Sequence, residues 1–456
     1  MWPCFVSLRP CQCRNWGGPL AVLFLLGLLV SVGATTTSGN KLARSEKSGP
    51  RLTSDWNGSV STRDGARLHL VADLGSVVIH TQNSGRVDYR IHLETDASQR
   101  DAKYLLERFV VSARETPEGV YVRGQTLDRR CSGRLWVTLD LNVPRNYSLD
   151  VLTGGGSIET EDINGRVTLS TSGGNITAGN IGGPARLETK GGHITVKNVT
   201  GELVADTGGG HITTGSIGGS ASLHTTGGHI RAAGVQGTAH LETGGGNVTL
   251  EHSGTELVAI TTGGQIEVGE AAGLVRARTG GGGIRVVRVS GPTNLQTVGG
   301  SIYLTQVDSA VTASAGAGGI TAWFVAPSKL QRTCELQSSD GDIVVYLPRQ
   351  LPVTIDAQIQ MGDQHRFIVD PAFPLKVSYE DSANGSGMVR AEGALNGGGE
   401  VLRLRTVAGN IRLALSDSSK QIQLYKQQME QLQLQLETQL RKFEQAQHSS
   451  EDSPQP

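Results

Sequence analysis

Branched aliphatic residues return every 18 positions through the middle of this chain, each after a glycine-rich run such as Thr153-Gly-Gly-Gly-Ser-Ile158. We call these residues anchors, and a threonine stands five positions before each of the first nine. The anchors are Ile158, Ile176, Ile194, Ile212, Ile230, Val248, Ile266, Ile284, Ile302 and Ile320. A fixed period of this length predicts an all-β fold, a β-solenoid of 18-residue coils in which each anchor stacks on the next.

Each coil contains two short stretches in which apolar and polar residues alternate. One starts at the anchor, and the other starts nine residues later, as Val167 and Leu169 show. A period of two is typical of a strand with one buried face, so each coil should hold two strands. We attribute the glycine pair before each anchor to a corner with positive φ, at which the chain turns without a Cβ clash. Valine at Gly209 or Gly210 should therefore destabilise the fold more than a change at Thr213.

The regular solenoid is expected over residues 151–325, with less regular sequence on either side. Residues 59–150 predict a β-rich N-terminal cap with one short helix over 96–109, where apolar residues recur at spacings of three and four. Residues 326–415 predict a continuation and a β-rich C-terminal cap that covers the last open edge. In the N-terminal cap, strands are expected at 68–72, 77–81, 87–93, 119–124 and 135–141.

Residues 416–447 contain no glycine or proline, and glutamine, leucine and glutamate dominate them. A heptad seam follows Ile422, Tyr425, Met429, Leu432, Leu436, Gln439, Phe443 and Ala446. This seam predicts an amphipathic C-terminal α-helix, which either forms a coiled coil and makes a homo-oligomer or folds back alone on the solenoid. Residues 448–456 are expected to be a disordered tail.

An apolar run from Pro19 to Ala34 follows Arg9 and Arg14. Residues 1–34 are therefore interpreted as a secretory signal peptide, or as an N-terminal anchor if they are not cleaved. A membrane is a partner only in the second case. Residues 35–58 are polar and rich in Thr, Ser and Gly, which is typical of a disordered linker.

Composition narrows the functional classes. The 41 basic and 42 acidic side chains offer no net basic surface, so nucleic acid is not an expected partner. Of five cysteines, only Cys131 and Cys334 follow the apolar run, and neither has metal-binding or redox spacing. Export would allow a disulfide between them, but the sequence leaves that bond open.

Motifs for enzymatic chemistry were sought in the sequence. It contains no Gly-x-Ser-x-Gly elbow, His-Glu-x-x-His helix or phosphate-binding Gly-Lys-Ser/Thr loop. Calcium-binding rolls share the 18-residue period but need an aspartate in every glycine-rich segment, where this chain has other polar residues. We therefore expect no catalytic residue and no cofactor.

Two rows of polar side chains are candidate sites. His193, His211 and His229 precede successive anchors, and a stacked row of imidazoles could bind a transition metal; a solvated turn is the alternative. A second row on the outer face of the longer strands could bind a cation or a sugar, or be a solvated face. Its members are Glu188, Asp206, His224 and Glu242. A threonine column follows Thr177, Thr195, Thr213 and Thr249.

The pattern resembles the bacterial putative-adhesin family, a β-strand-repeat domain of unknown function. The matching features are Asn142-Val-Pro-Arg145 before Leu152-Thr-Gly-Gly-Gly-Ser-Ile158, the repeated Gly-Gly-x-Ile, Asp340-Gly-Asp-Ile343, Leu395-Asn-Gly-Gly-Gly399 and Gly409-Asn-Ile411. The resemblance covers residues 68–415. The resemblance implies an exported envelope solenoid and carries over no catalytic residue, because fold does not fix function.

These observations predict a non-enzymatic, exported β-solenoid that serves as an adhesin-like structural or binding module of the cell envelope. It would lie in the periplasm, at the cell surface or on a membrane anchor, and its partner would be a glycan or an envelope protein. The alternative is a carbohydrate-active β-helix enzyme. Unlike charges converging on one face would favour that alternative.

Overall fold

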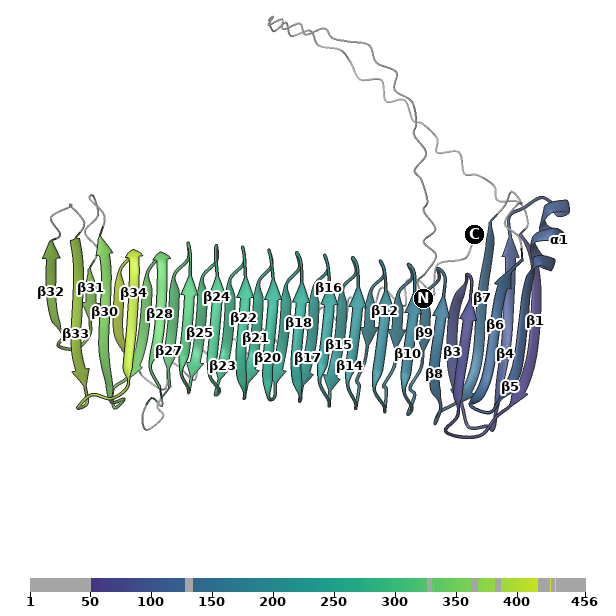
Figure 1. Cartoon of the computed structure of the whole chain (residues 1–456), viewed down its shortest axis with the longest axis horizontal. Helices are drawn as coiled ribbons and strands as arrows, with labels where there is room; N and C mark the ends of the chain where they lie inside the picture. Colours follow the sequence, from purple (N-terminus) through teal and green to yellow (C-terminus); the bar gives the residue numbers. More distant parts are fainter. Residues whose placement is uncertain are drawn as a thin grey trace, which may run out of the picture. The chain divides into compact units, whose positions relative to one another are not determined.

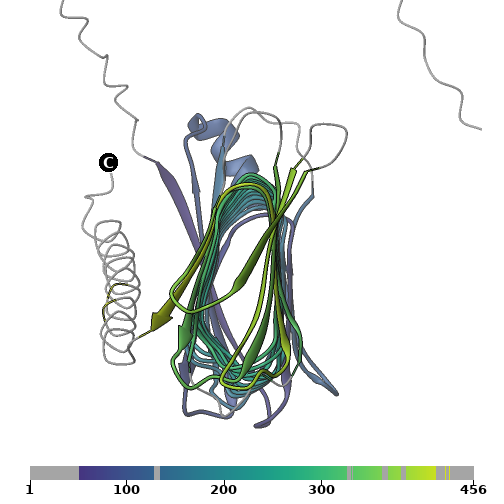
Figure 2. The same ribbon diagram turned by 90° about the vertical axis from the view of Figure 1, so that its left-hand side faces the viewer.

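The computed structural model describes residues 51–127, 134–325, 330, 332–361, 368–381 and 387–416, together with positions 427 and 431. Two long β-sheets face each other, and the chain passes from one to the other in every coil (Figures 1 and 2). One short helix, α1 (Gln99–Arg108), lies at the N-terminal end of the stack (Figure 1). The expected all-β solenoid is confirmed.

We call the two sheets A and B, and both are largely parallel. Sheet A runs in the order β1 (Leu52–Ser61), β4 (Arg86–Thr95), β7 (Leu135–Pro144), β3 (Ser76–Gln82), β9 (Ile158–Thr160), β11 (Ile176–Ala178), β13 (Ile194–Val196), β15 (Ile212–Ile217), β17 (Ile230–Val235), β19 (Val248–Ser253), β21 (Ile266–Ala271), β23 (Ile284–Val289), β25 (Ile302–Val307), β27 (Ile320–Phe324), β29 (Ile343–Pro348), β35 (Ile411–Ser416) and β31 (Val369–Pro371).

Sheet B contains the second strand of each coil. Its order is β5 (Phe109–Thr116), β6 (Gly119–Thr126), β2 (Arg67–Ala72), β8 (Ser148–Thr153), β10 (Val167–Thr171), β12 (Ala185–Thr189), β14 (Leu203–Thr207), β16 (Ala221–Thr225), β18 (Thr238–Thr243), β20 (Glu256–Thr261), β22 (Leu274–Thr279), β24 (Thr293–Thr297), β26 (Val311–Ala315), β28 (Cys334–Asp340), β34 (Val401–Ala408), β30 (Val353–Met361), β33 (Gly387–Leu395) and β32 (Lys376–Asp381).

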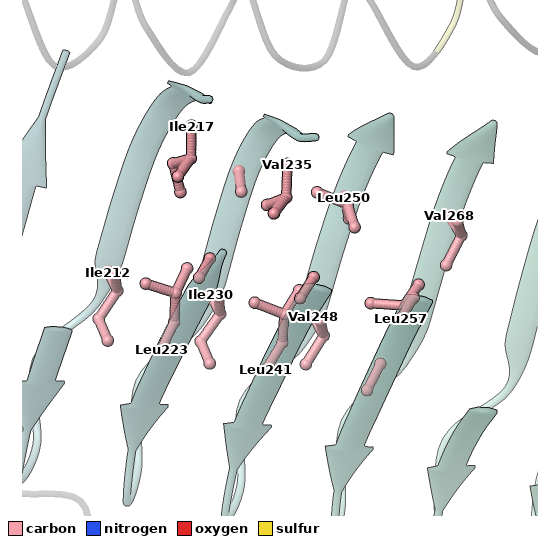
Figure 3. Close-up of a cluster of buried hydrophobic side chains, with 14 of the residues drawn as sticks. Ile212, Ile217, Leu223, Ile230, Val235, Leu241, Val248, Leu250, Leu257 and Val268 are labelled. Carbon is pink, nitrogen blue, oxygen red and sulfur yellow. The ribbon is translucent and has the colours of Figure 1, made fainter. Parts of the chain in front are cut away.

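The anchors form the core column that the repeat predicts. Each pairs with the anchor of the next coil, as Ile212 does with Ile230, and all ten are 0% exposed. Figure 3 shows the anchors Ile212, Ile230 and Val248 with Leu223 and Leu241 of the facing sheet. Ile343 and Ile411 extend the same column, so the fragments after residue 325 do continue the solenoid. Each buried aliphatic side chain contributes about 2 kcal/mol to folding.

The coils at the two ends are stacked out of sequence order. The coil of β2 and β3 lies between that of β6 and β7 and that of β8 and β9. At the other end, the coil of β34 and β35 lies between that of β28 and β29 and that of β30 and β31. Antiparallel strands complete both ends, with β1, β4 and β5 at one and β33 and β32 at the other.

The linker expected over 35–58 is wrong from Leu52 onward, because β1 covers residues 52–61. β1 is an edge strand that pairs with β4 along its whole length and buries neither face. Apolar alternation, the signal sought in the sequence, is therefore missing from it. Backbone hydrogen bonds hold such a strand whatever its side chains are.

The N-terminal region otherwise follows its predicted elements. The expected strands correspond to β2, β3, β4, β6 and β7, and the helix begins at the N-cap Ser98, whose Oγ accepts the Asp101 N–H. Ala102, Leu105 and Phe109 are buried. The strand β5, which directly follows the helix, was not predicted. Within the ranges given above, no helix is long and apolar enough to cross a membrane.

Several predictions fall on residues outside those described. They are the signal or anchor segment (1–34), the first part of the linker, the heptad seam and the tail (448–456). Gln427 and Gln431, the two described positions of the seam region, are helical and exposed. These predictions remain untested.

The disulfide that the sequence left open also involves a residue outside the described ranges, Cys131. Cys334 is buried in β28, and burial raises the pKa of its thiol. β6, which ends at Thr126, is twelve strand spacings from β28, about 58 Å at 4.8 Å per strand. Five residues span at most about 18 Å. The bond therefore cannot close within one copy of the chain.

Candidate functional site

The threonines before the anchors join neighbouring coils. Thr207 is buried, and its Oγ1 donates to the carbonyl of Gly192 in the preceding coil at 2.7 Å. The same oxygen accepts the N–H of Gly210 at 3.3 Å. Equivalent bonds recur from Thr189 to Thr297. These threonines are therefore satisfied core groups and offer nothing to a ligand.

The glycine pair meets one of the two expectations for it. No repeat glycine is among the described residues with positive φ, so that part of the explanation is wrong. The expected Cβ clash is confirmed at Gly210, where a Cβ would lie 1.9 Å from the carbonyl oxygen of Gly192. A Cβ on Gly209 would lie 3.9 Å from its nearest neighbour, so only the second glycine of the pair is required sterically.

The three histidines are stacked as the repeat predicts. The ring centroids of His193 and His211 are 4.9 Å apart, as are those of His211 and His229. Each Nδ1 accepts the backbone N–H of the next residue in the row: His211 N to His193 Nδ1 at 2.9 Å, then His229 N to His211 Nδ1 at 2.9 Å. Asn175 and Asn247 do the same with their side-chain oxygens. The row is a set of backbone acceptors.

An imidazole accepts a hydrogen bond at Nδ1 only in its neutral form. A ring nitrogen that accepts an N–H carries no proton itself. Burial lowers the pKa of His211, and nearby His193, His229 and Arg231 lower it further. Burial and then Arg231 lower the pKa of His229. Among the residues that the structure describes, no three His, Cys, Asp or Glu side chains gather closely enough to hold a metal ion.

The second candidate row lies on the outer face of sheet B. Glu188 pairs with Asp206, Asp206 with His224, and His224 with Glu242 across four neighbouring strands, β12 to β18. Like charges meet only between Glu188 and Asp206, because His224 Nδ1 lies 3.1 Å from Asp206 Oδ2. The sequence therefore placed these residues correctly.

The basic side chains that pair with this row were not predicted from the sequence. Arg186 forms an ion pair with Glu188, and His240 Nε2 lies 3.5 Å from Glu242 Oε2. Arg186 and His240 precede these acids by two positions, so they share the outer face. Applying the period of two to polar residues, as was done for apolar ones, would have found them. Each acid of the row thus has a basic side chain within reach.

Sheet A carries the threonine column on its outer face, with Arg231 interrupting it between Thr213 and Thr249. Further along the same face, Trp323 of β27 stacks on Tyr346 of β29 with centroids 4.6 Å apart. Their positions are 23 residues apart because a longer connection precedes β28. The 18-residue period therefore could not reveal this pair.

Stacked parallel coils with paired outward rows define a β-solenoid protein. Residues 69–414 match the model of the Toastrack DUF4097 family, so the chain belongs to this family. The assignment agrees with the resemblance seen in the repeat and brings no assigned chemistry.

Individual relatives are distant. No curated protein matches the chain. A putative adhesin from Bacteroides fragilis is 15% identical, with a TM-score of 0.29, and the match covers 56% of this chain and 96% of that one. One from Parabacteroides distasonis is 13% identical, with a TM-score of 0.28 and coverage of 54% and 92%. A putative cell adhesion protein from Clostridium sporogenes is 8% identical, with a TM-score of 0.16 and coverage of 80% and 100%.

Proposed function

We propose that this protein is an exported, non-enzymatic, adhesin-like binding module whose partner is a glycan or an envelope protein. The outer face of sheet B carries the proposal. From β8 to β26 the strands are parallel and keep one register, so their outward side chains form two continuous rows. The apolar run from Pro19 to Ala34 supports export.

The chemistry of this face suits a partner rich in hydroxyl or amide groups. Over β12 to β18 it offers donors from Arg186 and acceptors from Glu188, Asp206 and Glu242. A parallel sheet holds these groups in place before a ligand arrives. Pre-organisation of this kind reduces the entropy lost on binding, so many modest contacts can add up along the rows.

Binding explains this face better than catalysis does. Acidic and basic side chains do meet here, as in the Arg186–Glu188 ion pair and the contact of His224 with Asp206. The His224 and Asp206 side chains are 45% and 55% exposed, so they lie in solvent on a sheet surface. Catalytic groups usually lie in concave sites that exclude water and shift their pKa values.

The test compares binding and cleavage on one panel of polysaccharides. We expect wild type to bind at least one of them without releasing reducing ends. The triple variant Glu188→Gln, Asp206→Asn, Glu242→Gln should bind it about tenfold more weakly or worse, because charge-assisted hydrogen bonds become neutral ones.

The matched control is Glu159→Gln with Glu161→Gln, which removes exposed acids from the sheet A side of early coils. It should bind like wild type, and thermal melts should show that all variants fold. Release of reducing ends would contradict the proposal, and so would equal binding by the triple variant and wild type.

A further inference from the structure

The outer face of sheet A contains a row of side chains that is covered toward its C-terminal end. The row is formed by the third residue after each anchor, which points away from the core because its neighbour, the second residue, points inward. We call it the outer row of sheet A. From β15 to β27 it comprises Gly215, Ala233, Glu251, Gly269, Val287, Thr305 and Trp323. Earlier coils place Glu161 and Lys197 at this position, and both are exposed.

Later coils bury the same position. Val287 is 2% exposed and Thr305 is 1% exposed, although both lie on the outer side of the sheet. The preceding member of the row is Gly269, which has no side chain to cover Val287, and the following residue in the strand, Arg288, is exposed. On sheet B the outward Arg278 of the same stack is exposed. The cover is therefore specific to the outer row.

Charged groups in and beside the row are partly buried as well. Burial lowers the pKa of Arg231, although nearby Glu267 opposes the shift. Burial raises the pKa of the Glu251 carboxyl, with His252 acting against it. Burial also raises the pKa of the Asp308 carboxyl, although Arg288 and a hydrogen bond with Ser290 oppose this shift. These three groups span β17 to the turn after β25, which is the stretch over which the row is covered.

We propose that residues 418–447 fold back as one amphipathic helix and dock their heptad seam along the outer row of sheet A. The C-terminal segment leaves sheet A close to the end of the outer row, as this docking requires. Ala414 of β35 pairs with Tyr346, which pairs with Trp323 at the end of the row. β35 ends at Ser416, only two residues beyond Ala414.

The length of the segment fits the row. Thirty residues of α-helix span about 45 Å. From β35 to β17 there are seven strand spacings, or about 34 Å. Gln427 and Gln431 are helical and exposed, and neither belongs to the heptad seam. The seam is thus the face left to meet the sheet.

Docking in this way has a functional consequence. The apolar face of the helix is buried within one copy of the chain, so this segment does not join two copies. It also occupies sheet A and leaves the outer face of sheet B as the open surface. A coiled coil between copies would use the seam elsewhere and leave Val287 in solvent.

The test measures tryptic cleavage of the full chain at Lys420, Lys426, Arg441 and Lys442. Wild type should be resistant at these sites and monomeric by light scattering. Val287→Glu should raise the cleavage rate about tenfold or more, because a buried unpaired carboxylate expels the helix and proteolysis follows the open population. Lys197→Glu, at the same strand position in an uncovered coil, should leave the rate unchanged.

A second variant, within the C-terminal segment, distinguishes release of the helix from misfolding of the solenoid. Leu436→Glu should release the helix as Val287→Glu does, with an unchanged thermal melt of the solenoid. Equal cleavage rates for wild type and both variants would overturn the proposal. So would a dimer whose mass falls to that of a monomer when residues 417–456 are deleted, since that result identifies the coiled coil.

Discussion

At the scale of single residues, contacts between coils determine which residue types the repeat tolerates. The carbonyl of Gly192, in the preceding coil, constrains both Thr207 and Gly210. It accepts the hydrogen bond of Thr207 and would collide with a Cβ on Gly210. The sequence revealed both columns and predicted a Cβ clash at the glycines, but it did not identify the carbonyl involved, and the positive φ that it also predicted is absent from the described repeat glycines. A steric contact with the preceding coil depends on which carbonyl faces the corner, and one coil's sequence does not contain that information.

The two glycines of a pair should therefore respond differently to alanine. Gly210→Ala should lower the free energy of unfolding by about 1–3 kcal/mol, because its Cβ meets a backbone carbonyl that cannot move alone. Gly209→Ala should change it by less than about 0.5 kcal/mol. Denaturant unfolding of both variants measures the difference. Equal losses would show that φ, rather than the contact, makes these glycines necessary.

At the scale of secondary structure, the histidine row connects β13, β15 and β17 through their leading residues. The repeat predicted the position and the stacking of the histidines, but it did not predict that each Nδ1 accepts a backbone N–H. Asparagine fills the same role at Asn175 and Asn247. The difference is that only imidazole titrates near neutral pH.

This difference predicts an acid-sensitive stack. The pKa of His211 and His229 in the folded chain lies below the ordinary value of 6.5, so the unfolded chain binds more protons as the pH falls. The neutral imidazoles therefore contribute their full stability above pH 6.5. This contribution is lost as the pH falls from 6.5 toward the lower pKa of the folded chain.

The variant His193→Asn, His211→Asn, His229→Asn keeps an acceptor at each position without the titration. Between about pH 7.5 and about pH 5 it should lose less unfolding free energy than wild type. Parallel curves for the two proteins would contradict the role assigned to the row.

At the scale of the whole molecule, the repeat predicted the stack but not its ends. The period identified the column from Ile158 to Ile320, because identical coils must bury identical positions. The edge strand β1 lacked apolar alternation, and the insertion of the β2 and β3 coil between later coils leaves no trace in local sequence. The pairing of Trp323 with Tyr346 was not predicted either, because a longer connection changes the spacing between these residues.

The central claim is that residues eighteen positions apart lie side by side on neighbouring coils. Cysteine cross-linking tests it most directly, with products mapped by peptide mass spectrometry. Val204→Cys with Ser222→Cys joins paired positions, about 4.8 Å apart, within the range that a disulfide spans. Val204→Cys with His240→Cys places the thiols two coils apart, at about 9.6 Å. Mild oxidation should cross-link the first pair within one chain and leave the second pair reduced; cross-linking of both pairs alike, or of neither, would contradict the stack.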